Sequence, residues 1–205
     1  PAACRIAQAL RQYTAHSPLS VASMAPTVEP REASAAGTTS MAVRDGLRAR
    51  LDKSLAPSVQ DATVLVVGLG SGGSQTLEAL ARSSVEKFVV IDPDVEEAAN
   101  PSRSGYDAED IGASKCTAIT RRIQAINPGA AVTSYEKRLN DLNPDELAEL
   151  VDRVDYVVAA TDDPDAQYRL NHIAWQRGKP AIFAGVYERG AAGEIVYTIP
   201  GATSC

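Results

Sequence analysis

Val64-Leu-Val-Val-Gly-Leu-Gly-Ser-Gly-Gly73 is the stretch of sequence that decides the fold. Four apolar residues lead directly into glycines at positions 68, 70, 72 and 73. A buried strand that ends in a glycine turn and opens a helix forms a cradle for phosphate. Glycine lets the backbone approach the ligand, and the helix N-terminus offers free N–H groups. By itself, the pattern predicts a nucleotide site, typically for a dinucleotide.

Outward from this stretch, apolar runs alternate with helical patterns along the chain. Strands separated by helices of about 10–15 residues predict the α/β class, with a doubly wound, mostly parallel Rossmann-like sheet. No helical pattern separates the last two apolar runs, which predicts an antiparallel addition at one edge. The expected strands are 63–67, 87–91, 131–135, 156–160, 181–184 and 194–199, and the expected helices are 74–82, 114–126, one from 143 onward, and about 165–177.

The first forty residues differ in composition from the rest of the chain. Residues 1–40 are expected to form an N-terminal segment or linker, partly disordered, with a short helix within 1–16, because 17–40 are rich in Ser, Ala, Pro, Thr and Gly. Leucines at 47, 51 and 55 predict a helix over 41–56. The chain begins at Pro1 and stops at Cys205 just after an expected strand, which suggests a fragment of a longer protein.

Composition narrows the classes of partner. The formal net charge is −6 and aromatic residues make up 5%, which disfavours nonspecific binding of nucleic acid and stacking of single strands. No apolar run reaches the roughly 18 residues that span a membrane, so no membrane association is expected. Three widely separated cysteines (Cys4, Cys116 and Cys205) favour a reduced, cytoplasmic setting over a disulfide framework.

A second set of polar residues follows the glycine turn. Asp92 closes the second expected strand, where an acid hydrogen-bonds the ribose of any ribonucleotide. Asn100, Arg103 and Lys115 would add one amide and two cations beside the cradle. A triphosphate carries about four negative charges, which cations and metal ions commonly offset. A nicotinamide cofactor would leave these cations and Asp162 unused, although an NAD-dependent oxidoreductase stays an alternative interpretation.

Taken in order, the motifs of residues 60–200 resemble those of the ThiF/MoeB/HesA family, the adenylation fold of ubiquitin-activating enzymes. The resemblance implies that 41–205 is a ThiF-like ATP-binding adenylation domain with its C-terminal part missing. The matching motifs are Gly68-Leu-Gly-Ser-Gly-Gly73, Ile91-Asp-Pro-Asp94, Asn100-x-x-Arg103, Asp110-Ile-Gly-x-x-Lys115, Ala125-Ile-Asn-Pro128, Thr161-Asp162-Asp163, Gly178-Lys-Pro180 and Gly193.

The resemblance implies an ATP-dependent adenylyltransferase. Its substrate would be a carboxylate, typically the C-terminal glycine of a ubiquitin-like or sulfur-carrier protein. Arg44, with Arg48 and Arg50 as rivals, would be the cation that one subunit of a homodimer contributes to the site of the other. The remaining implied roles are phosphate binding at Gly68, Gly70, Ser71 and Gly73, nucleotide contacts at Asp92 (the ribose) and Asp94, a grip on the phosphates by Asn100, Arg103 and Lys115, and Mg²⁺ binding at Asp162.

Several positions depart from the family pattern. Ser104 and Gln167 stand where the family has a glutamine and an arginine, which keeps open a catalytically weakened relative that acts as a scaffold or heterodimer partner. Cys205 falls where the first of four zinc-binding thiolates would stand. A structural Zn²⁺ is therefore expected only in a longer form of the protein.

Overall fold

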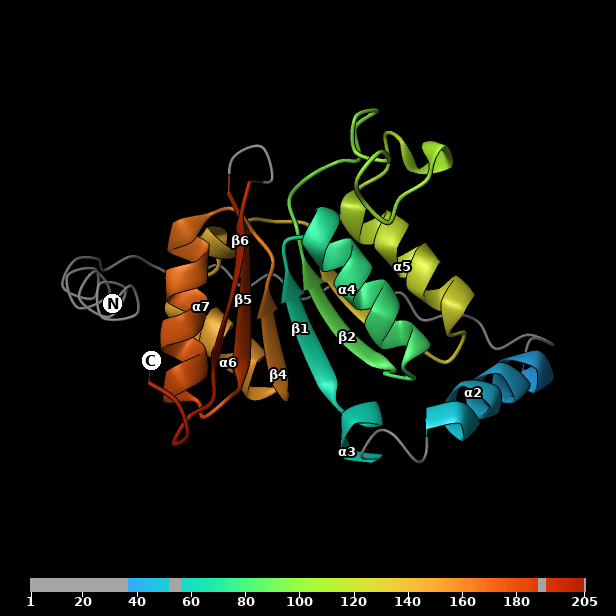
Figure 1. Cartoon of the computed structure of the whole chain (residues 1–205), viewed down its shortest axis with the longest axis horizontal. Helices are drawn as coiled ribbons and strands as arrows, with labels where there is room; N and C mark the ends of the chain where they lie inside the picture. The colour runs from blue at the N-terminus through green and yellow to red at the C-terminus, as the bar shows by residue number, and fades with distance from the viewer. Residues whose placement is uncertain (1–36, 52–56, 188–190, 205) are drawn as a thin grey trace.

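The computed structural model describes residues 37–51, 57–187 and 191–204, which form an α/β fold around one six-stranded sheet (Figure 1). The expected helix within 1–16, the linker to residue 36 and the end of the helix expected over 41–56 lie outside the described residues. The strand order is β3-β2-β1-β4-β5-β6. The strands are β1 (Thr63–Val67), β2 (Lys87–Ile91), β3 (Ala131–Tyr135), β4 (Tyr156–Ala159), β5 (Ala181–Val186) and β6 (Gly193–Thr198).

Helices cover both faces of the sheet at its strands β1 and β2. Side chains of β1 alternate between two cores, with Val64 and Val66 packed on the side of α4 and α5, and Leu65 and Val67 on the side of α6 and α7. Burial on both faces explains why these strands are continuous apolar runs. The helices are α2 (Gly37–Leu51), α3 (Pro57–Gln60), α4 (Ser71–Arg82), α5 (Lys115–Ile126), α6 (Pro144–Asp152) and α7 (Pro164–Gln176), with short 3₁₀ turns η1 (Ala108–Asp110) and η2 (Leu139–Asp141).

The fold expected from the sequence is confirmed. Strands β1 to β5 pair in parallel, and β6 adds to β5 in antiparallel register. The main difference is that α4 begins at Ser71 rather than at 74. Two of the four glycines therefore lie inside the first helical turn, where their N–H groups face no preceding turn of helix.

The strand order reverses between β1 and β4, whose carboxyl ends lie side by side. From β1 the chain winds outward through β2 to β3, and it then returns to the other side of β1 as β4. Ligands of such sheets bind outside the carboxyl ends of the strands at this reversal point. The glycine turn follows β1 directly, and Thr161 and Asp162 follow β4, so the two segments expected to bind nucleotide lie next to each other at this reversal point.

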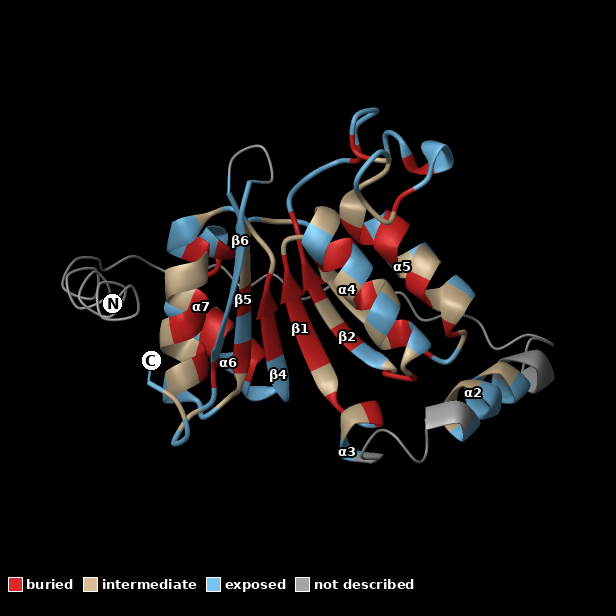
Figure 2. Cartoon of the chain, in the orientation of Figure 1, coloured by how far each residue is buried: buried red, intermediate tan, exposed pale blue. Residues whose placement is uncertain are grey.

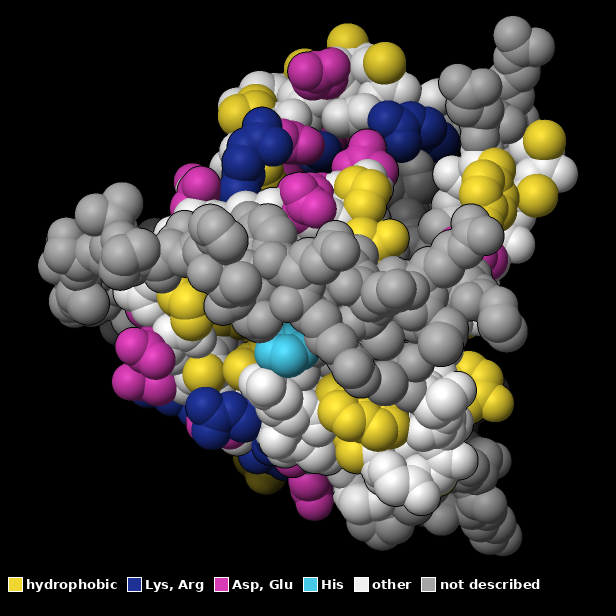
Figure 3. Space-filling model, turned by 90° about the vertical axis from the view of Figure 1, so that its left-hand side faces the viewer, with side chains coloured by type: hydrophobic (Ala, Val, Ile, Leu, Met, Phe, Trp, Pro, Cys, Tyr) yellow, Lys and Arg dark blue, Asp and Glu magenta, His cyan; other side chains and the backbone are white. Residues whose placement is uncertain are grey.

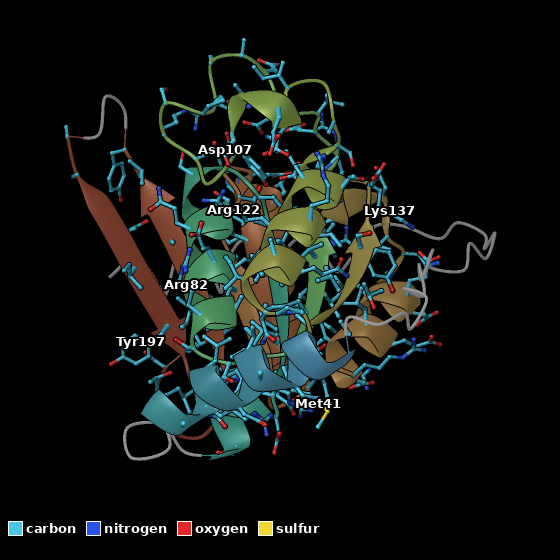
Figure 4. The ribbon with its side chains drawn as sticks, turned by 90° about the vertical axis from the view of Figure 1, so that its right-hand side faces the viewer. Met41, Arg82, Asp107, Arg122, Lys137 and Tyr197 are labelled. Carbon is cyan, nitrogen blue, oxygen red and sulfur yellow. The ribbon has the colours of Figure 1, made fainter. Side chains whose placement is uncertain are left out.

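One part of the sheet is covered by none of the helices that the structure describes. On the α4–α5 side, β5 and β6 carry exposed apolar residues, and Figure 2 colours exposed positions of these strands pale blue. In Figure 4, Tyr197 lies on the outer edge of the molecule, away from α4 and α5. We call this surface the uncovered sheet face; it consists of Tyr156, Ile182, Val186, Ile195 and Tyr197.

The opposite side of the molecule has a different character. Where grey atoms do not cover it, Figure 3 shows positive and negative side chains interspersed. Such mixing produces no broad field of one sign. Among the described helices, none combines the length and apolarity needed to cross a membrane.

Candidate nucleotide-binding site

Two glycines of the turn are required by close backbone packing. Gly68 has φ of 86°, and a Cβ there would lie 2.7 Å from the Ala160 carbonyl and the Thr161 nitrogen. A Cβ on Gly73 would lie 1.9 Å from the Gly68 carbonyl oxygen. These contacts bring the end of β1, the start of α4 and the end of β4 together.

The other two glycines of the turn, Gly70 and Gly72, have room for a side chain. No atom lies within 4 Å of a Cβ built on Gly70, and the nearest atom to one on Gly72 is 3.8 Å away. Within residues 57–187, no protein acceptor is hydrogen-bonded to the backbone N–H groups of Gly70, Ser71, Gly72 and Gly73. Free N–H groups at a helix N-terminus are suited to binding an anion, and the helix dipole adds to this attraction.

The side chain of Asp92 stabilises the glycine turn through hydrogen bonds. Its Oδ2 accepts a hydrogen bond from Leu69 N–H at 2.6 Å, and its Oδ1 accepts one from Asp94 N–H at 2.8 Å. Burial raises the pKa of the Asp92 carboxyl, although the two N–H donors oppose the shift. Asp92 thus shapes the turn in this state, in addition to its expected role toward the ribose.

Arg103 comes from the long loop after β2 and reaches the first residue of α4. Its Nη1 donates to Ser71 Oγ at 2.9 Å, and its Nη2 donates to Asn100 Oδ1 at 3.1 Å. Asn100 is buried beneath it. The guanidinium is held by neutral partners and keeps its full charge beside the free N–H groups. In this arrangement Asn100 orients the guanidinium of Arg103.

Lys115 is the second cation, at the first position of α5. Its Nζ lies 2.8 Å from Asp94 Oδ2. Burial would lower the pKa of Lys115, but the hydrogen bond to Asp94 and the charges of Asp92, Asp94 and Glu96 outweigh this effect and raise it. Lys115 is therefore cationic and already paired with an acid that is half exposed.

The end of β4 contributes two neighbouring acids with different roles. Asp163 caps α7 by accepting from Asp165 N–H and Ala166 N–H. Asp162 is exposed, and its carboxylate has no hydrogen bond or ion pair with any residue that the structure describes. A free carboxylate oxygen is a ligand that Mg²⁺ prefers, together with water and phosphate oxygens. The described residues include no group of three or more His, Cys, Asp or Glu side chains placed to hold a metal by themselves, so the site fits a metal that arrives with phosphate.

Arg44 lies far from the other predicted site residues of its own chain. It is carried by α2, and its Nε lies 2.6 Å from Glu86 Oε1, just before β2 begins. Glu86 lies where the parallel strands begin, and the glycine turn lies where β1 ends. Arg44 and the turn therefore lie at opposite ends of the strands. Figure 4 shows the same separation, with Met41 of α2 at the bottom and Asp107 of the long loop at the top. The rival Arg48 also points to Glu86, at 3.6 Å.

Sequence reasoning missed two buried residues of the long loop. Tyr106 donates its hydroxyl to the Leu69 carbonyl at 2.8 Å. Glu96 is almost fully buried, and its Oε2 has no partner among the described residues. The only available signal was that Tyr106 is the one aromatic residue in the polar stretch 93–112.

Comparison with known protein families identifies the family to which this chain belongs. A profile described as the ThiF family matches residues 47–205. This chain belongs to the ThiF family. The family assigned from the glycine turn and the ordered motifs is thereby confirmed.

Individual relatives carry informative names. A sulfur carrier protein adenylyltransferase of Thermus thermophilus is 34% identical over 128 residues, which are 62% of this chain and 46% of the relative. Ubiquitin-like modifier-activating enzyme 5 of Dictyostelium discoideum is 28% identical over 157 residues, or 72% of this chain and 41% of the relative. This ThiF-family chain thus spans less than half the length of these relatives.

Solved structures support the fold. Escherichia coli MccB, solved with ATP, superposes with a TM-score of 0.61 at 24% identity, covering 80% of this chain and 44% of MccB. A second MccB structure, with MccA-N7isoASN, gives 0.62 at 23% identity over 80% of this chain and 44% of MccB. At this level of identity the likeness concerns the fold of this ThiF-family chain alone.

Proposed function

We propose that this ThiF-family chain is the nucleotide-binding part of an ATP-dependent adenylyltransferase. The observation that carries the proposal is the set of four free N–H groups at the start of α4, with Arg103 bonded to Ser71 in the same turn. Lys115 at the start of α5 and Asp162 after the neighbouring strand β4 complete the proposed site. Two curated relatives are named for activating a sulfur carrier protein or a ubiquitin-like modifier. The proposed substrate is therefore the C-terminal glycine carboxylate of such a carrier protein.

The chemistry needs no protein nucleophile. A carboxylate oxygen of the carrier attacks the α-phosphorus of ATP, the bond from that phosphorus to the bridging oxygen breaks, and pyrophosphate leaves. Negative charge accumulates on the phosphate oxygens during the attack. Fixed donors placed where charge develops stabilise such a transition state. We propose this role for the free N–H groups of the glycine turn, Arg103 and Lys115.

Asp162 is the proposed Mg²⁺ ligand. Bound with the nucleotide, the ion would polarise phosphate oxygens and offset part of their charge. Lys115 must exchange Asp94 for a phosphate oxygen when the nucleotide binds. Because Asp94 is half exposed, water can solvate its carboxylate after this exchange.

We further propose that the protein forms a homodimer in which the uncovered sheet face packs against the partner subunit. Val186 and Ile195 are 82% and 74% exposed, which is unusual for branched apolar residues that lie next to each other on a sheet. Arg44 is proposed to bind the nucleotide held by the partner subunit. In its own subunit it is paired with Glu86, at the end of the strands opposite to the glycine turn. A cytoplasmic location also remains a proposal. We also propose that residues 1–40 are a linker before an adenylation domain. A structural Zn²⁺ is proposed only for a longer form of the protein.

The proposed activity is tested by Mg²⁺-dependent exchange of pyrophosphate into ATP in the full-length protein, with candidate carrier proteins added. Asp162→Ala should abolish exchange. The matched control is Asp165→Ala, which removes another exposed carboxylate at the start of α7 and should retain exchange. Normal exchange by Asp162→Ala would refute the metal assignment. ATP binding without exchange, for every carrier, would instead favour a weakened relative that acts as a scaffold, and NAD binding without ATP binding would favour an oxidoreductase.

A further inference from the structure

Leu69, between the first two glycines of the turn, has both of its backbone polar groups bound by side chains. Its N–H donates to Asp92 at 2.6 Å, and its carbonyl accepts from the Tyr106 hydroxyl at 2.8 Å. Leu69 is fully buried and Tyr106 is 3% exposed, so water does not compete for either bond. These two side chains come from separate segments, the end of β2 and the long loop.

The loop that carries Tyr106 is fastened to α4 and α5. Gly105 N–H donates to the Ser74 hydroxyl of α4 at 3.0 Å. Directly after Tyr106, Asp107 pairs with Arg122 of α5 at 2.7 Å, a contact whose two residues lie near each other in Figure 4. Asp110 closes the 3₁₀ turn by accepting from Asp107 N–H at 2.9 Å. Tyr106 is therefore held by its neighbours in the chain and does not depend on Leu69 for its position.

The peptide that joins Leu69 to Gly70 determines where the first free N–H group points. In a planar trans peptide, the carbonyl of one residue and the N–H of the next point in opposite directions. Fixing the Leu69 carbonyl on a buried hydroxyl therefore directs the Gly70 N–H away from the interior. Gly70 has no side chain to pack, and glycine has the most backbone freedom to lose. A hydrogen bond on the preceding carbonyl is thus the contact that orients this peptide.

We propose that Tyr106 is a positioning residue for nucleotide binding, whose hydroxyl orients the Leu69–Gly70 peptide so that the glycine turn presents its N–H groups to phosphate. This inference rests on the proposed function. Burial raises the pKa of Tyr106 far above its usual value, so the hydroxyl stays a donor at working pH. Tyr106 touches the turn from its buried side, and its effect on phosphate passes through the Leu69 carbonyl.

Tyr106→Phe tests the inference by removing one oxygen atom. The dissociation constant for Mg²⁺–ATP, measured by calorimetry, should rise about tenfold, the loss expected for one well-formed hydrogen bond. The matched control is Thr120→Val on α5, which removes another hydroxyl-to-carbonyl bond, from Thr120 to Cys116 at 2.7 Å. This control should be destabilised to a similar extent without a change in ATP affinity.

A second measurement separates positioning from loss of stability. In the wild-type protein, Mg²⁺–ATP should slow hydrogen exchange of the amides of residues 70–73, and in Tyr106→Phe this protection should be lost at ATP concentrations that saturate the control. Unchanged ATP affinity and unchanged protection in Tyr106→Phe would overturn the inference. A wild-type protein that does not bind ATP would overturn the proposed function itself, so the two failures are distinguishable.

Discussion

Gly73→Ala should destabilise the protein, although alanine is the better helix former. A Cβ at this position would lie 1.9 Å from the Gly68 carbonyl oxygen, and both groups are backbone, so no side chain can rotate away. Relief requires α4 to move from the end of β1 by about 1 Å or more, and overpacking of this kind costs about 1–3 kcal/mol. Gly72→Ala is the matched control in the same turn, because its Cβ would make an ordinary contact at 3.8 Å.

The two alanine variants should shift the free energy of unfolding in opposite directions. Replacing a helical glycine without strain stabilises by about 0.4–1 kcal/mol. The two variants should therefore differ by about 1.4–4 kcal/mol, once the overpacking of Gly73→Ala is added. Equilibrium urea unfolding, followed by circular dichroism, measures this difference, and equal slopes against urea would show that the same surface is exposed. If Gly73→Ala were as stable as Gly72→Ala, the close approach of α4 to β1 would be wrong.

Three further predictions concern other parts of the molecule. Burial raises the pKa of the Glu96 carboxyl. The folded protein therefore loses stability as the pH rises from the usual pKa of a glutamate through the raised pKa, because the buried group must ionise. Glu96→Gln cannot ionise, so its free energy of unfolding should increase relative to that of the wild type from pH 4 to pH 7. Arg122→Ala and Asp107→Ala, combined in a double-mutant cycle, should show a coupling of at most about 1 kcal/mol that declines with added salt, because the pair is partly exposed; a salt-independent coupling would contradict this reasoning. Ile195→Glu should convert the proposed dimer to a monomer in light scattering, and a monomeric wild-type protein would refute the dimer.

Strand β1 was the easiest to predict because it is buried on both faces. Val64 to Val67 are apolar without interruption, and that pattern depends only on the environment of the strand. The start of α4 was harder to place. Glycine is a weak helix former, so the sequence indicated a helix only after Gly73. In the structure, Gly72 and Gly73 are helical because Gly73 must pack against the Gly68 carbonyl. That constraint comes from tertiary contact rather than from local propensity.

The loop between β2 and α5 shows the limit of sequence reasoning for the site. Its polar residues were interpreted as ligand-binding groups, and Arg103 and Lys115 do lie beside the glycine turn or its neighbouring strand end. The bonds that shape the loop join residues far apart in the chain, such as Tyr106 and Leu69, and no local periodicity records them. The family resemblance singled out Arg44, but the sequence cannot show at which end of the strands its helix lies.

The two cations differ in how they are held, and this difference bears on how the site would work. Arg103 is oriented by a hydroxyl and an amide, which fix its direction without offsetting its charge. Lys115 is paired with a carboxylate, so part of its attraction for phosphate is offset until Asp94 is displaced. Preorganised charge contributes most when nothing must rearrange as the transition state forms. Arg103 and the free N–H groups therefore suit the first capture of an anion, whereas Lys115 becomes available only as a triphosphate competes with Asp94. A phosphate group that reaches Lys115 must be charged and close enough to replace a carboxylate at 2.8 Å, which favours a nucleotide whose phosphates extend from the glycine turn toward α5.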